Sequence, residues 1–336
     1  MQYYDQKKGR GTWEDAFDAA QFKDTVKNRY MYDVLFVGCY TEGLDPVNKG
    51  DYMYRDVFLK LFRPQYRVAA THQARIESAE ALIRRSRRVV FGGGGLLYNS
   101  LDRDYGRAEL KLLAKWYEIL ARTQTAYGFI SIGFQPKDPY KEGMSAETMD
   151  GGIFNIVKPF IEGASFICAR SEADRLLFSK WNHFTYYYPD LAFVLKRIGL
   201  ARGMQPQHRQ YLLTIGVTRD FNANILGQIR NLSLTHTHYH AVVSKGDHTN
   251  SDYSVFLPST PEIVNPLNLY DMDPYFAEAE YVFTTRFHGM IMAKLNCVPH
   301  VTTLLGQWKV KTFEDTEDPE TKAMTHLWHV HRFLKN

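Results

Sequence analysis

Short apolar runs alternate with amphipathic segments through the first half of the chain. DVLFVGCY (33–40), RVVFGGGG (88–95) and TAYGFISIGF (125–134) are rich in β-branched and aromatic residues, which predicts buried strands. YMYRDVFLKLF (52–62) and AELKLLAKWYEILAR (108–122) carry apolar residues at helical spacing, which predicts helices between these strands. Strands and helices that alternate at this pace predict a mostly parallel sheet with helices on both faces.

The alternation resumes in the second half, after a polar and basic stretch at residues 196–210 that has no core pattern. YLLTIGVT (211–218), HAVVSK (240–245) and YVFTT (281–285) predict strands, and MIMAKLN (290–296) predicts a helix. We therefore expect an α/β protein with two doubly wound, Rossmann-like lobes. The expected division is an N-terminal extension (1–30), an N-terminal lobe (31–200), a C-terminal lobe (205–313) and a C-terminal helical tail (314–336).

Composition narrows the class of ligand and the compartment. With 45% hydrophobic and 23% charged residues, the chain falls among ordinary globular proteins rather than disordered or fibrous ones. Its net charge of +4 suits a small anionic ligand but is too weak to indicate nucleic acid. The three cysteines lie far apart, each in or beside an apolar run, so we interpret them as reduced and the protein as cytoplasmic. The sequence predicts neither a signal peptide nor a membrane-spanning segment.

Candidate chemistry in the first lobe lies where strands are expected to end, the edge at which such sheets bind ligands. Gly93 and Gly94 belong to a run of four glycines after a predicted strand. Their backbone N–H groups could hold an oxyanion, or the run could simply permit a tight turn; it matches neither the dinucleotide nor the P-loop pattern. Asn48 and Asp51 follow the first strand. Asn48 is a candidate substrate contact, and Asp51 is either a helix N-cap or a carboxylate that binds or deprotonates a hydroxyl.

Both expected lobes place an arginine at a strand end. Arg170 ends the strand FICAR and precedes a helix that Ser171 is expected to cap, so a guanidinium and helix N–H donors could bind phosphate or carboxylate together. Arg286 and His288 follow the strand YVFTT and are expected to point the same way, because they are two residues apart in extended chain. In a shared pocket, Arg286 would bind an anion and His288 would give or take a proton. Salt bridges and a strand-end histidine are the structural alternatives.

The remaining histidines favour structural roles. HTHYH (236–240) could place three histidines on one strand face as metal ligands, but no carboxylate or cysteine partner is evident nearby, so exposure to solvent is favoured. His326, His329 and His331 lie in a C-terminal helical stretch that is expected to pack against the body of the protein. We therefore predict no metal site.

Six motifs follow one another along the chain, with Lys309 soon after the last. They are NKGD (48–51), FGGGGLLYNS (91–100), SIGFQP (131–136), CARSEADRLL (168–177), YPDLAF (188–193) and TTRFHGMIMAKLNCVPHV (284–301). Together they resemble the polysaccharide pyruvyl transferase family. The most specific is the last, which is similar to the family's S-x-R-x-H-G signature with Thr284 in place of serine.

The resemblance implies a two-lobed fold of the glycosyltransferase B type and transfer of a pyruvyl group from phosphoenolpyruvate to a sugar as a ketal. By that likeness Arg170 and Arg286 would hold the phosphate and carboxylate of the donor, His288 would be the acid/base residue and Lys309 a further anion contact. Asp51 is a weaker candidate for orienting or deprotonating an acceptor hydroxyl. The expected partners are phosphoenolpyruvate and a sugar or glycan acceptor, with a lipid-linked acceptor left open, and no cofactor is implied.

Two other functions remain open at this point. A nucleotide-sugar glycosyltransferase would use the same fold, but it would normally need an acidic residue for the ribose where TTRFHG offers arginine and histidine. A saccharide-binding module without catalysis would suit the 14% aromatic content, although Arg170, Arg286 and His288 are all present.

Overall fold

The computed structural model describes eight parts of the chain, namely residues 30–38, 49–98, 104–135, 151–202, 210–243, 252, 257–303 and 316–336. Several sequence predictions lie outside these residues. They are the N-terminal extension up to residue 29, the substrate contacts Asn48 and Lys309, and residues 203–209 of the polar stretch expected between the lobes.

The first lobe is built on a six-stranded parallel sheet in the order β2-β1-β3-β4-β5-β6. Its strands are β1 (Tyr32–Gly38), β2 (Val68–His72), β3 (Ser86–Tyr98), β4 (Tyr127–Gln135), β5 (Ile167–Ala169) and β6 (Thr185–Tyr187). Its helices are α1 (Lys49–Phe62), α2 (Ile76–Arg84), α3 (Asp104–Thr123), α4 (Gly151–Glu162), α5 (Glu172–Phe178) and the 3₁₀-helix η4 (Leu191–Leu195).

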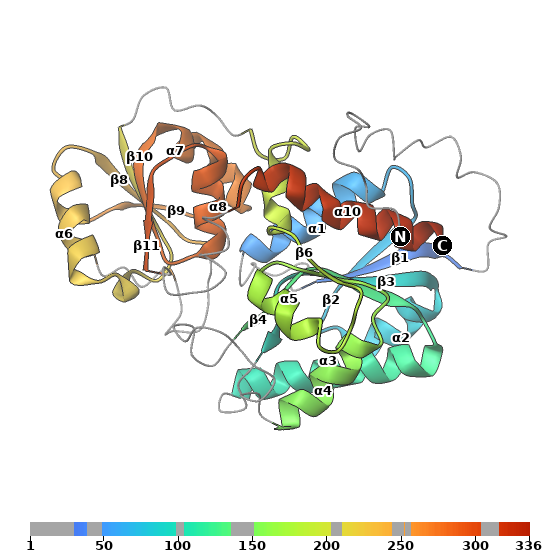
Figure 1. The fold of residues 1–336 in the computed structure, drawn as a ribbon. Helices are drawn as coiled ribbons and strands as arrows, with labels where there is room; N and C mark the ends of the chain where they lie inside the picture. The colour runs from blue at the N-terminus through green and yellow to red at the C-terminus, as the bar shows by residue number, and fades with distance from the viewer. Residues whose placement is uncertain are drawn as a thin grey trace.

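The second lobe, on the left of Figure 1, is built on a five-stranded parallel sheet. Its strand order is β11-β10-β7-β8-β9. Its strands are β7 (Tyr211–Ile215), β8 (Thr237–Ala241), β9 (Glu262–Val264), β10 (Ala279–Thr284) and β11 (His300–Thr302). Its helices are α6 (Ala223–Leu232), α7 (Asp273–Glu278), α8 (Phe287–Leu295) and the 3₁₀-helices η5 (Thr218–Asp220) and η6 (Leu269–Met272). The prediction of two parallel, Rossmann-like lobes is confirmed.

Strand β1 shows how the apolar runs give sheets covered on both faces. Val34 and Phe36 pack into the core beneath α1, whereas Leu35 and Val37 pack into the core formed with α2, α3 and α4. Successive side chains of a strand point to opposite faces, so a strand buried on both sides needs a continuous apolar run rather than an alternating one. DVLFVGCY has this pattern, and no solvent-facing side remains in its centre.

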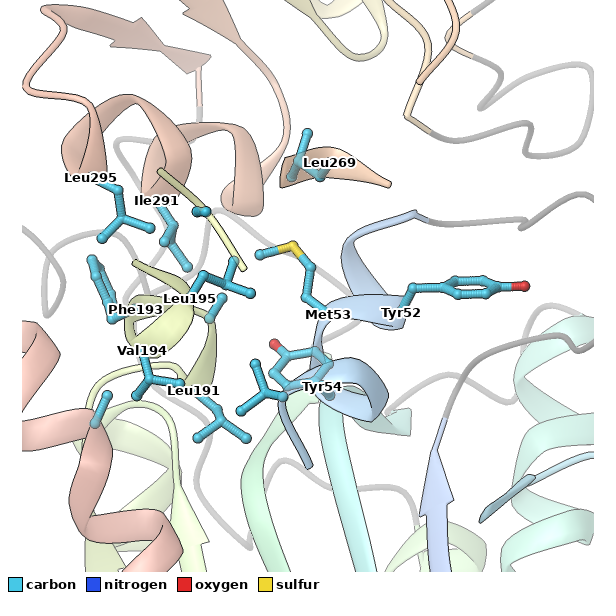
Figure 2. Packing of buried hydrophobic residues seen from close by; sticks show 14 of the residues in the cluster. Tyr52, Met53, Tyr54, Leu191, Phe193, Val194, Leu195, Leu269, Ile291 and Leu295 are labelled. Atoms are coloured by element: carbon cyan, nitrogen blue, oxygen red, sulfur yellow. The ribbon is translucent and has the colours of Figure 1, made fainter. Parts of the chain in front are cut away.

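The two lobes share one hydrophobic core. Met53 of α1 and Leu195 of η4 pack in the same cluster as Leu269, Ile291 and Leu295 of the second lobe (Figure 2). Burial of a side chain of this size stabilises by roughly 1.5–3 kcal/mol relative to exposure. The lobes are therefore joined by packing as well as by the chain, and this fixes α1 against α8.

The C-terminal helix α10 (Pro319–Lys335) returns to the first lobe (Figure 1), where it packs against η4 and β4. His326 Nε2 donates to the Pro189 carbonyl at 2.8 Å. His331 Nδ1 lies 2.7 Å from the hydroxyl of Tyr66, and His329 Nε2 lies 3.0 Å from the hydroxyl of Tyr188. These contacts confirm the predicted packing of the three histidines. None of the helices in the described ranges has the length and apolar character that crossing a membrane requires.

His326 makes the stability of the fold depend on pH. Burial disfavours the imidazolium and lowers the pKa of His326 to about 4. In the unfolded chain the pKa is about 6.5, so between these values the unfolded state binds more protons. The stabilisation is complete above pH 6.5 and is lost as pH falls toward 4, by about 3 kcal/mol. Urea unfolding at pH 7.5, 6, 5 and 4.5 measures this slope. His326→Gln does not titrate and should reduce it; an unchanged slope would contradict the assignment.

Candidate functional site

The segment after β10 does not place Arg286 and His288 as the sequence predicted. Arg286 is the extended residue before α8, with φ −111° and ψ 128°, and α8 already begins at Phe287. His288 therefore lies in the first helical turn. The reason given for both side chains pointing the same way therefore does not hold, because alternation applies only while the chain stays extended.

His288 reaches across to the first lobe. Its Nε2 lies 2.9 Å from the hydroxyl of Tyr54 on α1, and that hydroxyl donates to Asp190 Oδ2 at 2.6 Å. Because the single hydroxyl proton of Tyr54 goes to the carboxylate, the Tyr54 oxygen accepts from His288, and we assign the proton of the imidazole to Nε2. Burial raises the pKa of Tyr54 well above its usual value, as does the charge of Asp190, so the phenol stays neutral.

Arg170 lies beside the same carboxylate. Its Nη1 is 3.7 Å from Asp190 Oδ2, while His288 Nε2 is 4.0 Å from Asp190 Oδ1. Both Arg170 and Asp190 are buried. Burial alone would lower the pKa of Arg170, but the neighbouring Tyr54, Asp190 and Asp174 raise it, so the guanidinium keeps its charge. Its Cζ also lies 5.7 Å from the centre of the Phe287 ring, within the range of a cation–π contact.

The local sequence around Arg170 folds as predicted. Ser171 is the extended N-cap of α5, and its hydroxyl accepts from the backbone N–H of Asp174 at 3.1 Å. The Asp174 carboxylate in turn accepts from the N–H of Phe134 on β4 at 2.9 Å. At Gly133 a Cβ atom would lie 2.5 Å from Arg170 Nε, so only glycine lets the guanidinium lie over this strand.

The glycine run is part of β3 rather than a turn after it. Strand β3 continues to Tyr98, with a register shift against β4 after Gly94. Gly93 and Gly94 have φ values of +85° and +78°, which favour glycine. A Cβ at Gly93 would lie 2.0 Å from the Tyr54 ring, and one at Gly94 would lie 3.0 Å from Asp51 Oδ1. The glycines thus let α1 approach the sheet and seat Tyr54; their oxyanion role stays a prediction.

Asp51 lies in the first turn of α1, which begins at Lys49, so the alternative of an N-cap is wrong. Its carboxylate lies over Gly94, at the carboxyl end of the sheet. This location is compatible with a role toward an acceptor hydroxyl, which stays a prediction.

Gly50 fixes the approach of α1 to His288. A Cβ atom at this position would lie 2.1 Å from His288 Nδ1. We expect Gly50→Ala to lower the free energy of unfolding by about 1–3 kcal/mol, the usual cost of overpacking, although alanine normally favours a helix. Urea unfolding checks this.

Gly227→Ala is the matched control, because Gly227 also lies in a helix, α6, and a Cβ there meets nothing within 4 Å. It should raise the free energy of unfolding by about 0.4–1 kcal/mol. Equal effects of the two substitutions would argue against close packing at Gly50.

Arg286 takes part in a different set of contacts. Its Nε and Nη2 donate to Asp252 Oδ1 at 3.1 Å and 2.6 Å, and 25% of its side chain is exposed. Asp252 is fully buried. The structure thus brings Arg170 and His288 to one carboxylate, Asp190, whereas Asp252 holds Arg286 within the second lobe.

Two residues of the site were missed by the sequence analysis. Asp190 stands in the motif YPDLAF, which carried the resemblance but suggested no role. Tyr54 looked like one apolar position of an amphipathic helix, and only its contacts with Asp190 and His288 distinguish it. Within the described ranges, no group of three or more histidine, cysteine, aspartate or glutamate side chains could hold a metal ion.

Comparison with known proteins gives a family and a fold. A family model described as polysaccharide pyruvyl transferase matches residues 48–303. A search of curated proteins returned no significant match. A Listeria monocytogenes structure, described provisionally as a UDP-N-acetylglucosamine 2-epimerase, aligns with a TM-score of 0.52 and 9% identity over 90% of this chain and 88% of that chain. S. aureus MnaA with UDP aligns with a TM-score of 0.50 and 8% identity over 88% of this chain and 87% of that chain. At such low identity these structures show the fold alone, and they confirm the glycosyltransferase B type.

Proposed function

The chain belongs to the polysaccharide pyruvyl transferase family, and on this premise we propose that it transfers the pyruvyl group of phosphoenolpyruvate to a polysaccharide or glycan. Two hydroxyls of one sugar and one phosphoenolpyruvate give a cyclic ketal and inorganic phosphate. The observation that carries the proposal is the meeting of Arg170 and His288 at Asp190, between α1 of one lobe and α8 of the other.

The charge of the site suits this donor. Phosphoenolpyruvate carries about three negative charges near neutral pH, counting its phosphate and its carboxylate. Arg170 stays charged although it is buried, and its separation of 3.7 Å from Asp190 is longer than a hydrogen bond. Asp190 therefore supplies a counter-charge without a direct hydrogen bond to Nη1. Tyr54 also bonds this guanidinium, and the N–H donors that remain among its five would meet an anion of the donor. Arg286, immediately before α8, would bind the second anionic group beside the N-terminus of that helix.

His288 would supply the proton. The imidazolium protonates the methylene carbon of the enol, and the first sugar hydroxyl attacks the cationic carbon that results and returns its proton to the imidazole. Phosphate then leaves with the C–O bonding pair, and the second hydroxyl closes the ring and gives its proton to the departing phosphate. Asp190 stabilises positive charge on the imidazole, and Tyr54 holds its orientation through Nε2. Asp51 would orient an acceptor hydroxyl.

Phosphate release tests the proposal. Full-length protein is incubated with phosphoenolpyruvate and a panel of glycosides, and in parallel with nucleotide sugars and the same acceptors. We expect acceptor-dependent phosphate release from phosphoenolpyruvate, and a higher melting temperature with millimolar phosphoenolpyruvate alone. Nucleoside diphosphate release without any effect of phosphoenolpyruvate would instead support a nucleotide-sugar transferase.

A further inference from the structure

The motif HTHYH, which the proposed reaction does not use, forms part of a buried polar chain in the second lobe. His238 and His240 of β8 are buried on either side of Thr214 of β7, so the expectation that this motif faces solvent is wrong for both. Thr214 Oγ1 lies 3.1 Å from His238 Nε2 and 2.9 Å from His240 Nδ1. The outer nitrogens continue the chain, His238 Nδ1 to Ser259 Oγ at 2.7 Å and His240 Nε2 to the carbonyl oxygen of Asp252 at 2.8 Å.

The donors of this chain can be assigned in order from the Asp252 end. A carbonyl only accepts, so His240 Nε2 carries the proton, and Nδ1 of the neutral ring accepts from the Thr214 hydroxyl. The Tyr239 carbonyl lies farther from that hydroxyl, at 3.3 Å, and competes poorly. The Thr214 oxygen then accepts from His238 Nε2, and His238 Nδ1 accepts from Ser259.

This order requires both imidazoles to be neutral. Burial lowers the pKa of His238 to about 4, and a proton on the neighbouring His240 would lower it in the same direction. Burial also lowers the pKa of His240, against the opposing effect of Asp252. Every donor from Ser259 to His240 then points toward Asp252, and Thr214 is the link that both rings share.

Asp252 connects the chain to Arg286. His240 holds its backbone carbonyl, the N–H of Val243 donates to Oδ2 at 3.1 Å, and Arg286 donates to Oδ1. The aliphatic part of Arg286 is confined as well, because a Cβ at Gly216 would lie 2.9 Å from Arg286 Cγ. The guanidinium of Arg286 is thus aligned by the carboxylate of Asp252, and hydrogen bonds hold both the backbone and the side chain of Asp252.

We propose that Thr214, His238 and His240 are positioning residues, which hold Asp252 and thereby aim the guanidinium of Arg286 at the anionic donor. A guanidinium has five N–H donors, so its bonds to Asp252 are compatible with an anion on the same side chain. Alignment in the free protein avoids the cost of ordering a long side chain when the ligand binds. The ligand in this inference rests on the proposed function, whereas the alignment of Arg286 does not.

Thr214→Val tests this chain of hydrogen bonds, because valine keeps the shape of the side chain and removes the hydroxyl that both histidines share. We expect the dissociation constant of phosphoenolpyruvate, measured by calorimetry on the full chain, to rise about tenfold in Thr214→Val and to return to within about twofold of the wild type in Thr214→Ser. Thr185→Val is the matched control, since Thr185 is a buried strand threonine of the other lobe whose hydroxyl donates to the Asn182 carbonyl at 2.7 Å. It should leave the dissociation constant unchanged.

The ¹⁵N resonance of Arg286 Nε separates this inference from the proposed function. We expect an ordered Nε–H signal in the wild type and in Thr214→Ser that becomes mobile in Thr214→Val, with Arg286→Met identifying the peak. If phosphoenolpyruvate does not bind the wild type, the proposed function fails, and this signal alone decides whether the chain aligns Arg286. An Nε–H that stays equally ordered in Thr214→Val, or wild-type affinity in that variant while Arg286→Met loses binding, would overturn the inference.

Discussion

Replacement of His288 by alanine is expected to lower kcat for phosphate release from phosphoenolpyruvate by about 10²–10⁴-fold, the usual contribution of a positioned acid or base. The affinity for phosphoenolpyruvate should change only a few-fold, because Arg170 and Arg286 would still meet the charges of the donor. Steady-state kinetics with a saturating acceptor, together with calorimetry on the donor alone, measure the two effects separately.

A loss of activity in His288→Ala is informative only if the protein stays folded. Urea unfolding measures whether His288→Ala is still folded. The contact between Arg170 and Asp190 does not involve His288, so a folded variant should still bind the donor. His183→Ala removes an exposed histidine of the first lobe and should leave kcat unchanged. A kcat for His288→Ala within about threefold of the wild type would rule out His288 as the proton donor.

Most of the fold could be predicted because each element carries its own pattern. A continuous apolar run such as DVLFVGCY is what a parallel strand covered on both faces requires, and β1 has this environment. The errors lie at element ends. The glycines after RVVF suggested a turn, but β3 continues through Gly93 and Gly94 because α1 packs there and Tyr54 occupies the space that side chains would fill. Packing between elements decided this, and local propensity did not.

The candidate site was only partly predictable for the same reason. Arg170, Arg286 and His288 could be found from their places at the ends of strands. Tyr54 could not, because its partners Asp190 and His288 are 136 and 234 residues away in sequence. A hydrogen bond across such separations leaves no local pattern. The direction of the His288 side chain likewise depends on where α8 begins. The helix starts at Phe287, so His288 is helical rather than extended.

Asp190→Ala is expected to lower the free energy of unfolding by about 3–5 kcal/mol, because it removes a buried carboxylate that balances the charge of Arg170 and leaves Asp174 to balance it alone. Arg170 and Asp190 expose 5% and 0% of their side chains. The substitution also removes the acceptor of the Tyr54 hydroxyl and the N-cap of η4, where Asp190 Oδ1 accepts from the N–H of Ala192 at 3.0 Å. Urea unfolding followed by tryptophan fluorescence, with the slope checked against the wild type, measures the loss.

Asp33→Ala provides the matched control for Asp190→Ala. Asp33 pairs with Arg67 at 2.8 Å, closer than the 3.7 Å between Arg170 and Asp190, but the Asp33 and Arg67 side chains are 29% and 45% exposed. Water can replace the lost partner at the surface, so Asp33→Ala should cost about 1 kcal/mol or less. If the distance between the charges alone set the loss of stability, Asp33→Ala would destabilise the protein more than Asp190→Ala. We expect burial to set it, so Asp190→Ala should destabilise the protein more. Asp190→Ala with a loss no larger than that of Asp33→Ala would show that Arg170 does not depend on Asp190 for its charge in the folded protein.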